Sequence, residues 1–282
     1  MRIFLKITLT VVAAIATLGV LHAQRPAMHE INAINDSIID EGYTLYLYDK
    51  LNWVASDYYR EMCSSKTASL SVTGNLNDSL LSTIMIDVEQ MKCVFECRLN
   101  LNTGDIEPFN LVRGLTKKEI ERAQRQIELL EQISTLKGIG SVKEAGNLNV
   151  DVIEISDKLT RVYLLQGTNK SKLIPFGNDY SIDFDANNNM LALRKYHNSF
   201  IPIDFSEKEG NIHKCTHSHL KDNPYITPTD IATFMLYGHD LYGMNTFSVY
   251  STALSCYFTY NVETHSILLV DDEETMQQPA GK

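Results

Sequence analysis

Short runs of alternating β-forming residues follow one another between residues 68 and 110. Thr83 to Ile86 and Cys93 to Leu101 have this pattern, and Asn102 to Asp105 (Asn-Thr-Gly-Asp) has the chemistry of a hairpin turn before Ile106. These features predict several strands in this part of the chain.

The next segment, from Thr116 to Leu136, has the pattern of an amphipathic helix. Thr116-Lys117-Lys118-Glu119 is a capping box, and the run that continues to Leu136 places its apolar residues on one side of a helix. Gly138 and Gly140 end the helix, and residues 138–148 have the composition of a linker. We place a domain boundary there.

The second half returns to strand patterns. Val152 to Ile155 and Val162 to Gln166 are β-branched and apolar, and Tyr180 to Phe184 with Met190 to Tyr196 form a predicted hairpin. Further strands are expected at 213–219, 247–250, 256–260 and 267–270, with a helix from Pro228 to about Tyr237.

These elements predict an α+β protein with an N-terminal strand-rich module that has one long helix, residues 24–148, and a second module, residues 149–271. Residues 272–282 form an acidic tail that we expect to be disordered. Arg25 to about Asp40 is polar and tolerates a helix, and we interpret it as a leader. The aromatic segment from Gly42 to Tyr59 mixes periods, so the pattern assigns it no element.

The first 23 residues have the organisation of a cleavable signal peptide. Arg2 and Lys6 are followed by an apolar run from Ile7 to Leu21 that ends at Leu21-His22-Ala23. We therefore expect an exported protein that begins near Gln24, located in the periplasm, at the cell surface or outside the cell. The run is short for a membrane span, and an uncleaved N-terminal anchor is the alternative.

Charge and cysteine content narrow the possible partners. The formal charge is −10, and removal of the two basic residues of the signal peptide makes it −12. This acidic balance argues against binding to nucleic acid or to anionic lipid, and no later segment is apolar for long enough to cross a membrane. The five cysteines leave at least one thiol unpaired, and the sequence does not reveal their pairing.

The residues with the clearest chemistry lie between Cys215 and Asp230. His217 and His219 are two residues apart on a predicted strand, so both imidazoles lie on one face and could reach one ion. A carboxylate from the following helix start, Asp230, would be a third ligand, which leaves one position of a tetrahedral zinc ion open, as in catalytic sites.

This stretch resembles the motif of the JAMM (MPN domain) metallopeptidases, which is His-x-His-Pro, six residues, then Ser-x-x-Asp. The spacing from His217 to Asp230 matches, with Leu220 in place of Pro and Thr227 in place of Ser. The resemblance implies a mixed sheet flanked by helices over 149–271, zinc bound by His217, His219 and Asp230, and Thr227 near the reacting oxygen. The family's catalytic glutamate has no match at Thr160, and Glu154 is the nearest candidate on a strand.

Other interpretations of the same residues remain open. Thr227, Pro228 and Asp230 form a good helix start without any metal. Cys215 is an alternative ligand or a small core residue, whereas His197, His239 and His265 have no partner pattern and are expected to be ordinary residues. The turn from Phe176 to Tyr180 is expected to be a plain turn.

We therefore expect an exported zinc hydrolase that acts on a peptide or isopeptide bond of a peptide or protein substrate. In that mechanism zinc activates water, Thr227 donates to the oxyanion and Glu154 shuttles the proton. The alternative is a non-catalytic JAMM-like binding or scaffold protein of the cell envelope, and a metal-storage or metal-sensing role is a third possibility.

Overall fold

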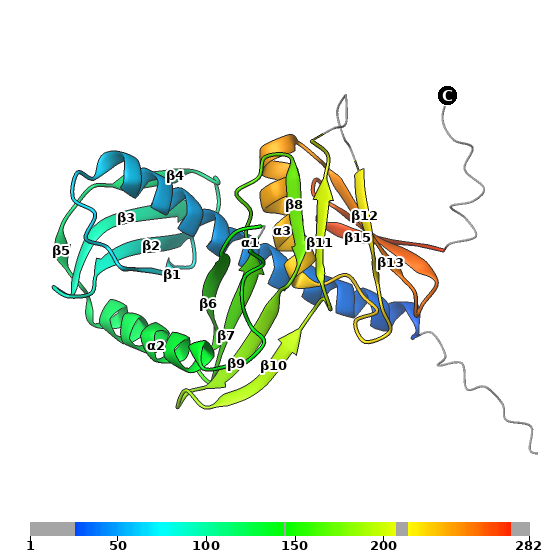
Figure 1. Ribbon diagram of the computed structural model, residues 1–282, viewed down its shortest axis with the longest axis horizontal. Coiled ribbons are helices and arrows are strands. Elements are labelled where there is room, and N and C mark those ends of the chain that lie inside the picture. The colour runs from blue at the N-terminus through cyan, green and yellow to red at the C-terminus, as the bar shows by residue number, and fades with distance from the viewer. Residues whose placement is uncertain (1–25, 144, 207–213, 272–282) are drawn as a thin grey trace, which may run out of the picture.

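The computed structural model describes residues 26–143, 145–206 and 214–271, and it confirms the α+β class (Figure 1). The predictions for the signal peptide at 1–23 and the tail at 272–282 concern residues outside these ranges. No helix in the described part of the chain combines the length and the apolar character needed to cross a membrane.

The longest element is helix α1 (Met28–Met62), which runs along both halves of the molecule (Figure 1). It includes the segment predicted to be a leader and the aromatic segment that received no element. That leader prediction was wrong, because Ile31 is fully buried in the main core. Helix α1 buries different faces along its length, which explains why the sequence shows mixed periods.

The first sheet confirms the strands predicted between residues 68 and 110. Its strands are β1 (Leu70–Asn77), β2 (Leu80–Asp87), β3 (Lys92–Asn100) and β4 (Ile106–Phe109), paired antiparallel in this order, with β5 (Arg113–Gly114) also on β3. The second half of α1 covers one face of this sheet through residues such as Leu51 and Tyr59.

Helix α2 (Lys117–Ser134) confirms the capping-box prediction, since Thr116 Oγ1 accepts the Glu119 N–H and the Glu119 carboxylate accepts the Thr116 N–H. Its residues Leu129 and Ile133 pack on a second antiparallel sheet of order β10-β9-β7-β6. The strands are β6 (Leu148–Ser156), β7 (Leu159–Gln166), β9 (Tyr180–Asp185) and β10 (Met190–Lys195).

Two smaller units complete the fold. Strands β8 (Leu173–Gly177) and β11 (Phe200–Asp204) form an antiparallel pair. The C-terminal sheet has the order β12-β13-β14-β15, with β12 parallel to β13 and the other neighbours antiparallel. Its strands are β12 (Lys214–His219), β13 (Thr246–Ser251), β14 (Cys256–Asn261) and β15 (Ser266–Asp271).

A short helix, α3 (Pro228–Thr233), and the π-helical segment η1 (Phe234–Asp240) connect β12 to β13. Helix α3 packs closely on α1 at Gly42, where an added Cβ atom would lie 2.8 Å from the Ile231 Cβ atom. Helix α1 therefore contacts elements on both sides of residue 148, and the domain boundary predicted there stays a prediction.

A buried carboxylate links the first sheet to α2. The Glu96 side chain is fully buried and accepts hydrogen bonds from Arg98 and Arg113, and Arg113 also pairs with Glu119. Burial alone would raise the pKa of Glu96, but the two guanidinium groups outweigh burial and lower it. All five cysteines lie in the described ranges, and none forms a disulfide.

Candidate metal centre

Strand β12 presents two of the predicted ligands on one face. Burial alternates along the strand, with Cys215, His217 and His219 buried and their neighbours exposed. The Nε2 atoms of His217 and His219 lie 2.9 Å apart. The prediction that the two imidazoles converge is therefore confirmed.

Asp230 reaches the same point from the start of α3. Thr227 is the N-cap of this helix, and Asp230 Oδ2 accepts hydrogen bonds from the Thr227 N–H at 2.8 Å and the Thr227 hydroxyl at 2.7 Å. Asp230 Oδ1 is buried and lies 3.2 Å from the Nε2 atoms of His197 and His217. The cap and the metal interpretation are therefore compatible, because each uses a different carboxylate oxygen.

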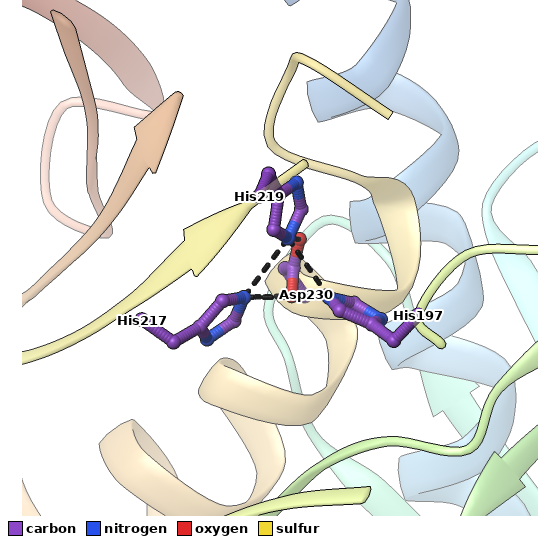
Figure 2. Close-up of side chains that lie close together, drawn as sticks. All are labelled: His197, His217, His219 and Asp230. Atoms are coloured by element: carbon purple, nitrogen blue, oxygen red, sulfur yellow. Dashed lines mark hydrogen bonds and ion pairs between the residues drawn. The ribbon is translucent and has the colours of Figure 1, made fainter. Parts of the chain in front are cut away.

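A third imidazole, His197, completes the cluster, and the expectation that it is an ordinary residue was wrong. Figure 2 shows its ring pointing at His217, His219 and Asp230 from the connection between β10 and β11. His197 Nε2 lies 3.3 Å from His217 Nε2 and 2.8 Å from His219 Nε2.

Gly177 lies close to the connection that carries His197. Gly177 has φ +79°, and an added Cβ atom would lie 2.2 Å from the carbonyl oxygen of Ser199. Only glycine permits this approach, which brings the turn before β9 against the connection after β10. Asp179, in that turn, lies beside His197 because the two residues flank the open end of the β9–β10 hairpin, where the Tyr196 N–H donates to the Asp179 carbonyl oxygen.

The four ligand atoms have the spacing that a tetrahedral ion requires. Asp230 Oδ1 lies 3.2 Å from the Nε2 atoms of both His197 and His217, and the three Nε2 atoms lie 2.8–3.3 Å from one another. His219 Nε2 lies 3.4 Å from the other oxygen of Asp230, Oδ2. A zinc ion with bonds of about 2.0–2.1 Å places tetrahedral ligand atoms about 3.3–3.4 Å apart. The four side chains therefore converge with separations close to, and in part shorter than, those of a tetrahedral zinc site.

Outer contacts orient two of the imidazoles. Asp179 accepts the Nδ1–H of His197 at 2.8 and 3.0 Å, and the backbone carbonyl of Tyr225 accepts the Nδ1–H of His219 at 2.6 Å. These bonds leave both Nε2 lone pairs free for an ion, as in the carboxylate–histidine–metal arrangement. His217 instead packs against the rings of Phe176 and Phe247, and its Nδ1 atom has no partner in the described part of the chain.

Electrostatics place the proton of the metal-free cluster on His197. Burial alone would lower the pKa of His197, but Asp179 and Asp230 outweigh burial and raise it to about 11. Burial lowers the pKa of His219 to about 4. Burial alone would raise the pKa of Asp230, but the three imidazoles hold it well below its ordinary value. A cation at the centre would take the place of this proton.

The structure does not bring Glu154 to this cluster. Its carboxylate pairs with Arg122 of α2 at 2.8 Å on β6. Glu154 on β6 pairs with Thr160 on β7, and Thr160 pairs with Phe184 on β9, so Glu154 lies level with Phe184. Asp179, which contacts His197 of the cluster, lies at the other end of β9, just before Tyr180. Glu154 and Asp179 are therefore separated by five residues, or about 16 Å, along the strand direction, in addition to two strand spacings of about 4.8 Å. Its role as a proton shuttle stays a prediction without support from this arrangement.

Thr227 and Cys215 lie near the centre in other roles. The Thr227 hydroxyl is fully used by the helix cap and by Thr229, so it positions Asp230. Its predicted role at an oxyanion is untested. Cys215 is buried in the main core and is not among the four converging ligands.

A sequence signal for His197 did exist. The predicted hairpin of 180–184 with 190–196 places the residues just outside its open end side by side, and these include Asp179 and His197. In comparisons with protein-family models and with curated proteins, none matched the chain. The geometry therefore supports a buried site of three histidines and one aspartate that could hold a metal ion.

Proposed function

We propose that this protein binds zinc as a structural ion, and that it is a non-catalytic binding or scaffold protein. The observation that carries the proposal is the closed ligand set. Structural zinc sites have four protein ligands, whereas catalytic sites keep a position for water. Here His197 would be the fourth protein ligand of the zinc ion, at the coordination position that the sequence analysis left open for water.

Burial and chemistry of the ligands support the same conclusion. All four side chains are buried, and Asp230 is fully buried. A set of three imidazole nitrogens and one carboxylate oxygen suits zinc. Such an ion would join the β10–β11 connection, β12 and α3, and would hold together segments that come from different sheets.

Metal analysis of the purified full chain tests this proposal. We expect one zinc ion per chain in the wild type and its loss in His217→Ala and His197→Ala, together with a lower melting temperature when a chelator removes the metal. Stoichiometric zinc whose removal leaves the melting temperature unchanged would argue against a structural role, and absence of zinc would refute the site.

The second candidate is a zinc hydrolase that resembles the JAMM peptidases. It is favoured by the spacing from His217 to Asp230 and by the order of strand β12, helix α3 and parallel strand β13. Thr227 and Tyr225, which both bond to ligands, also line an open hollow of about 450 Å³ that could admit a peptide. When bound, zinc would supply Lewis-acid activation of water.

A peptidase assay separates the two candidates. Cleavage of peptides by the zinc-loaded wild type, lost in Asp230→Ala, would favour the hydrolase. Stoichiometric zinc without cleavage of a broad peptide library supports the structural role.

Export and a peptide or protein partner belong to the same proposal. Cleavage after Ala23 would leave helix α1 intact, because α1 begins at Met28. Determination of the N-terminal residue of the mature protein tests export. An N-terminus near Gln24 is expected, and retention of Met1 in the cell envelope would favour an uncleaved anchor.

A further inference from the structure

Strand β10 is an edge strand of the second antiparallel sheet, and it exposes apolar side chains there. It pairs with β9 on one side, and no described strand pairs with its other side (Figure 1). Met190, Leu191 and Leu193 are 47%, 60% and 47% exposed, so this strand has the densest group of exposed large apolar side chains among the described residues. Single exposed apolar residues are ordinary, but an exposed apolar edge strand is a template for pairing with another chain.

The backbone of β10 presents hydrogen-bonding groups at this free edge. The Tyr196 N–H donates to the Asp179 carbonyl oxygen at 3.2 Å, and every second residue of an antiparallel strand bonds to the same neighbour. The residues between them, Leu193 and Lys195, therefore direct their N–H and C=O groups away from β9. The side-chain amide of Asn223, which donates to the Lys195 carbonyl oxygen at 3.3 Å, agrees with this direction. An added strand could therefore bond to the backbone of Leu193.

A hollow beside this edge could hold a side chain of the added strand. Arg194 and Tyr196 of β10 line an open hollow of about 450 Å³, together with Ile34 and Ile38 of α1 and Tyr225 of the loop after β12. Residues that lie opposite each other on paired strands place their side chains on the same face of the sheet. Side chains of an added strand that share the face of Arg194 would therefore point toward this hollow, whose walls suit an apolar group.

The charges of the edge favour an acidic partner. Arg194 and Lys195 are both exposed, and β10 contains no acidic residue. The Arg194 guanidinium lies 5.8 Å from the centre of the Tyr196 ring and forms no ion pair with another described residue. Pairing of β10 with a second copy of itself would place four cations and no acid on one ribbon, which disfavours a second copy. A strand with acidic side chains would complement both cations.

We propose that β10 binds an extended segment of a partner protein by strand addition. The segment would carry apolar β-forming residues, one of them in the hollow between β10 and α1, and acidic residues beside Arg194 and Lys195. Main-chain hydrogen bonds would provide affinity, whereas the hollow and the two cations would provide specificity. This inference rests on the proposed role as a binding protein, and it adds the surface and the class of partner.

Selection from a phage-displayed library of random decapeptides, with the purified full chain as the target, tests this surface. We expect the enriched peptides to combine consecutive apolar β-formers with acidic residues. A synthetic copy of such a peptide should bind on the order of tenfold more tightly than a copy whose acidic residues are replaced by lysine. The bound peptide should also slow hydrogen exchange of the Leu193 N–H, because that group would become a main-chain donor.

Two variants of the edge and a matched control make the test specific. Leu193→Pro removes an outward N–H without removing a bond to β9, and should weaken peptide binding about tenfold or more. Arg194→Glu should weaken binding about fivefold or more, whereas Lys117→Glu, a charge reversal at an exposed position of α2, should leave it unchanged. Zinc content, measured in each variant, separates a failure of this surface from a failure of the metal centre.

Several results would overturn the proposal. These are the absence of any library peptide that binds the wild type, selected peptides without acidic residues, and equally tight binding of the selected peptides to Leu193→Pro and Arg194→Glu. Sedimentation velocity tests the other occupant of the edge. Self-association of the wild type that Leu193→Pro abolishes would assign β10 to a second copy of the chain and would also overturn the proposal.

Discussion

Asp179 touches no metal ligand atom directly, yet we expect Asp179→Asn to weaken zinc binding 10–100-fold. Asp179 accepts the Nδ1–H of His197 at 2.8 and 3.0 Å. An asparagine oxygen can still accept that hydrogen bond and keep the ring oriented, but the negative charge that makes the imidazole more basic is lost. Carboxylates in this outer position contribute about 10–100-fold to metal affinity, or about 1.4–2.7 kcal/mol.

The predicted shift in stability follows from this change in affinity. At free zinc 100 times the wild-type Kd, zinc stabilises the wild type by about 2.7 kcal/mol. The same zinc concentration would stabilise the variant by only about 0.4–1.4 kcal/mol. For a chain of this size, the zinc-induced rise in melting temperature should fall from about 5–10 °C to about 1–6 °C.

Competition with a chromophoric chelator measures the affinity, and thermal unfolding with and without zinc measures the stability. Asp222→Asn, at an exposed position in the loop between β12 and α3, is the matched control and should bind zinc like the wild type. A zinc affinity of Asp179→Asn within twofold of the wild type would refute the reasoning. Asp179 also accepts a hydrogen bond from the Thr229 hydroxyl. If the substitution lowers the melting temperature of the metal-free protein but leaves the zinc affinity unchanged, Asp179 has a purely structural role through Thr229.

Three further changes test the fold, two near the site and one in the first sheet. Gly177→Ala should lower the unfolding free energy by about 2–3 kcal/mol and weaken zinc binding, because its Cβ atom would clash with Ser199; denaturant unfolding and a zinc titration measure this. Gly42→Val should cost about 1–3 kcal/mol in denaturant unfolding because it pushes α1 away from Ile231, and an unchanged midpoint would contradict the close contact. Glu96→Gln should cost about 1–3 kcal/mol at neutral pH. Folding lowers the pKa of Glu96, so its contribution to the unfolding free energy is fully present above the ordinary glutamate pKa of 4.5. This contribution is lost as the pH falls through the lower pKa of the folded state. The unfolding curves of the variant and the wild type should therefore converge in acid.

Local patterns predicted those parts of the fold in which neighbouring residues determine the structure. The capping box of Thr116 and Glu119 predicted the start of α2, and the turn at 102–105 predicted the link between β3 and β4. Helix α1 was missed because its two halves bury different faces against different partners, so no single period runs through it.

In the candidate site, too, local spacing predicted some of the residues and missed another. His217, His219 and Asp230 lie within 14 residues, on one strand and the next helix start, so their spacing was sufficient to predict that they converge. His197 lies 20 residues before His217, on the connection between β10 and β11, so no local spacing links it to the other three residues.

The sequence by itself therefore determined the α+β class, the caps of α2 and α3 and three of the four residues of the candidate site, because these follow from periods and spacings within short segments. Only the tertiary structure decided that a third histidine joins the cluster and that Glu154 pairs with Arg122 away from it. The physical reason is that these contacts join segments that are distant in the chain, and packing of α1 and the sheets brings them together.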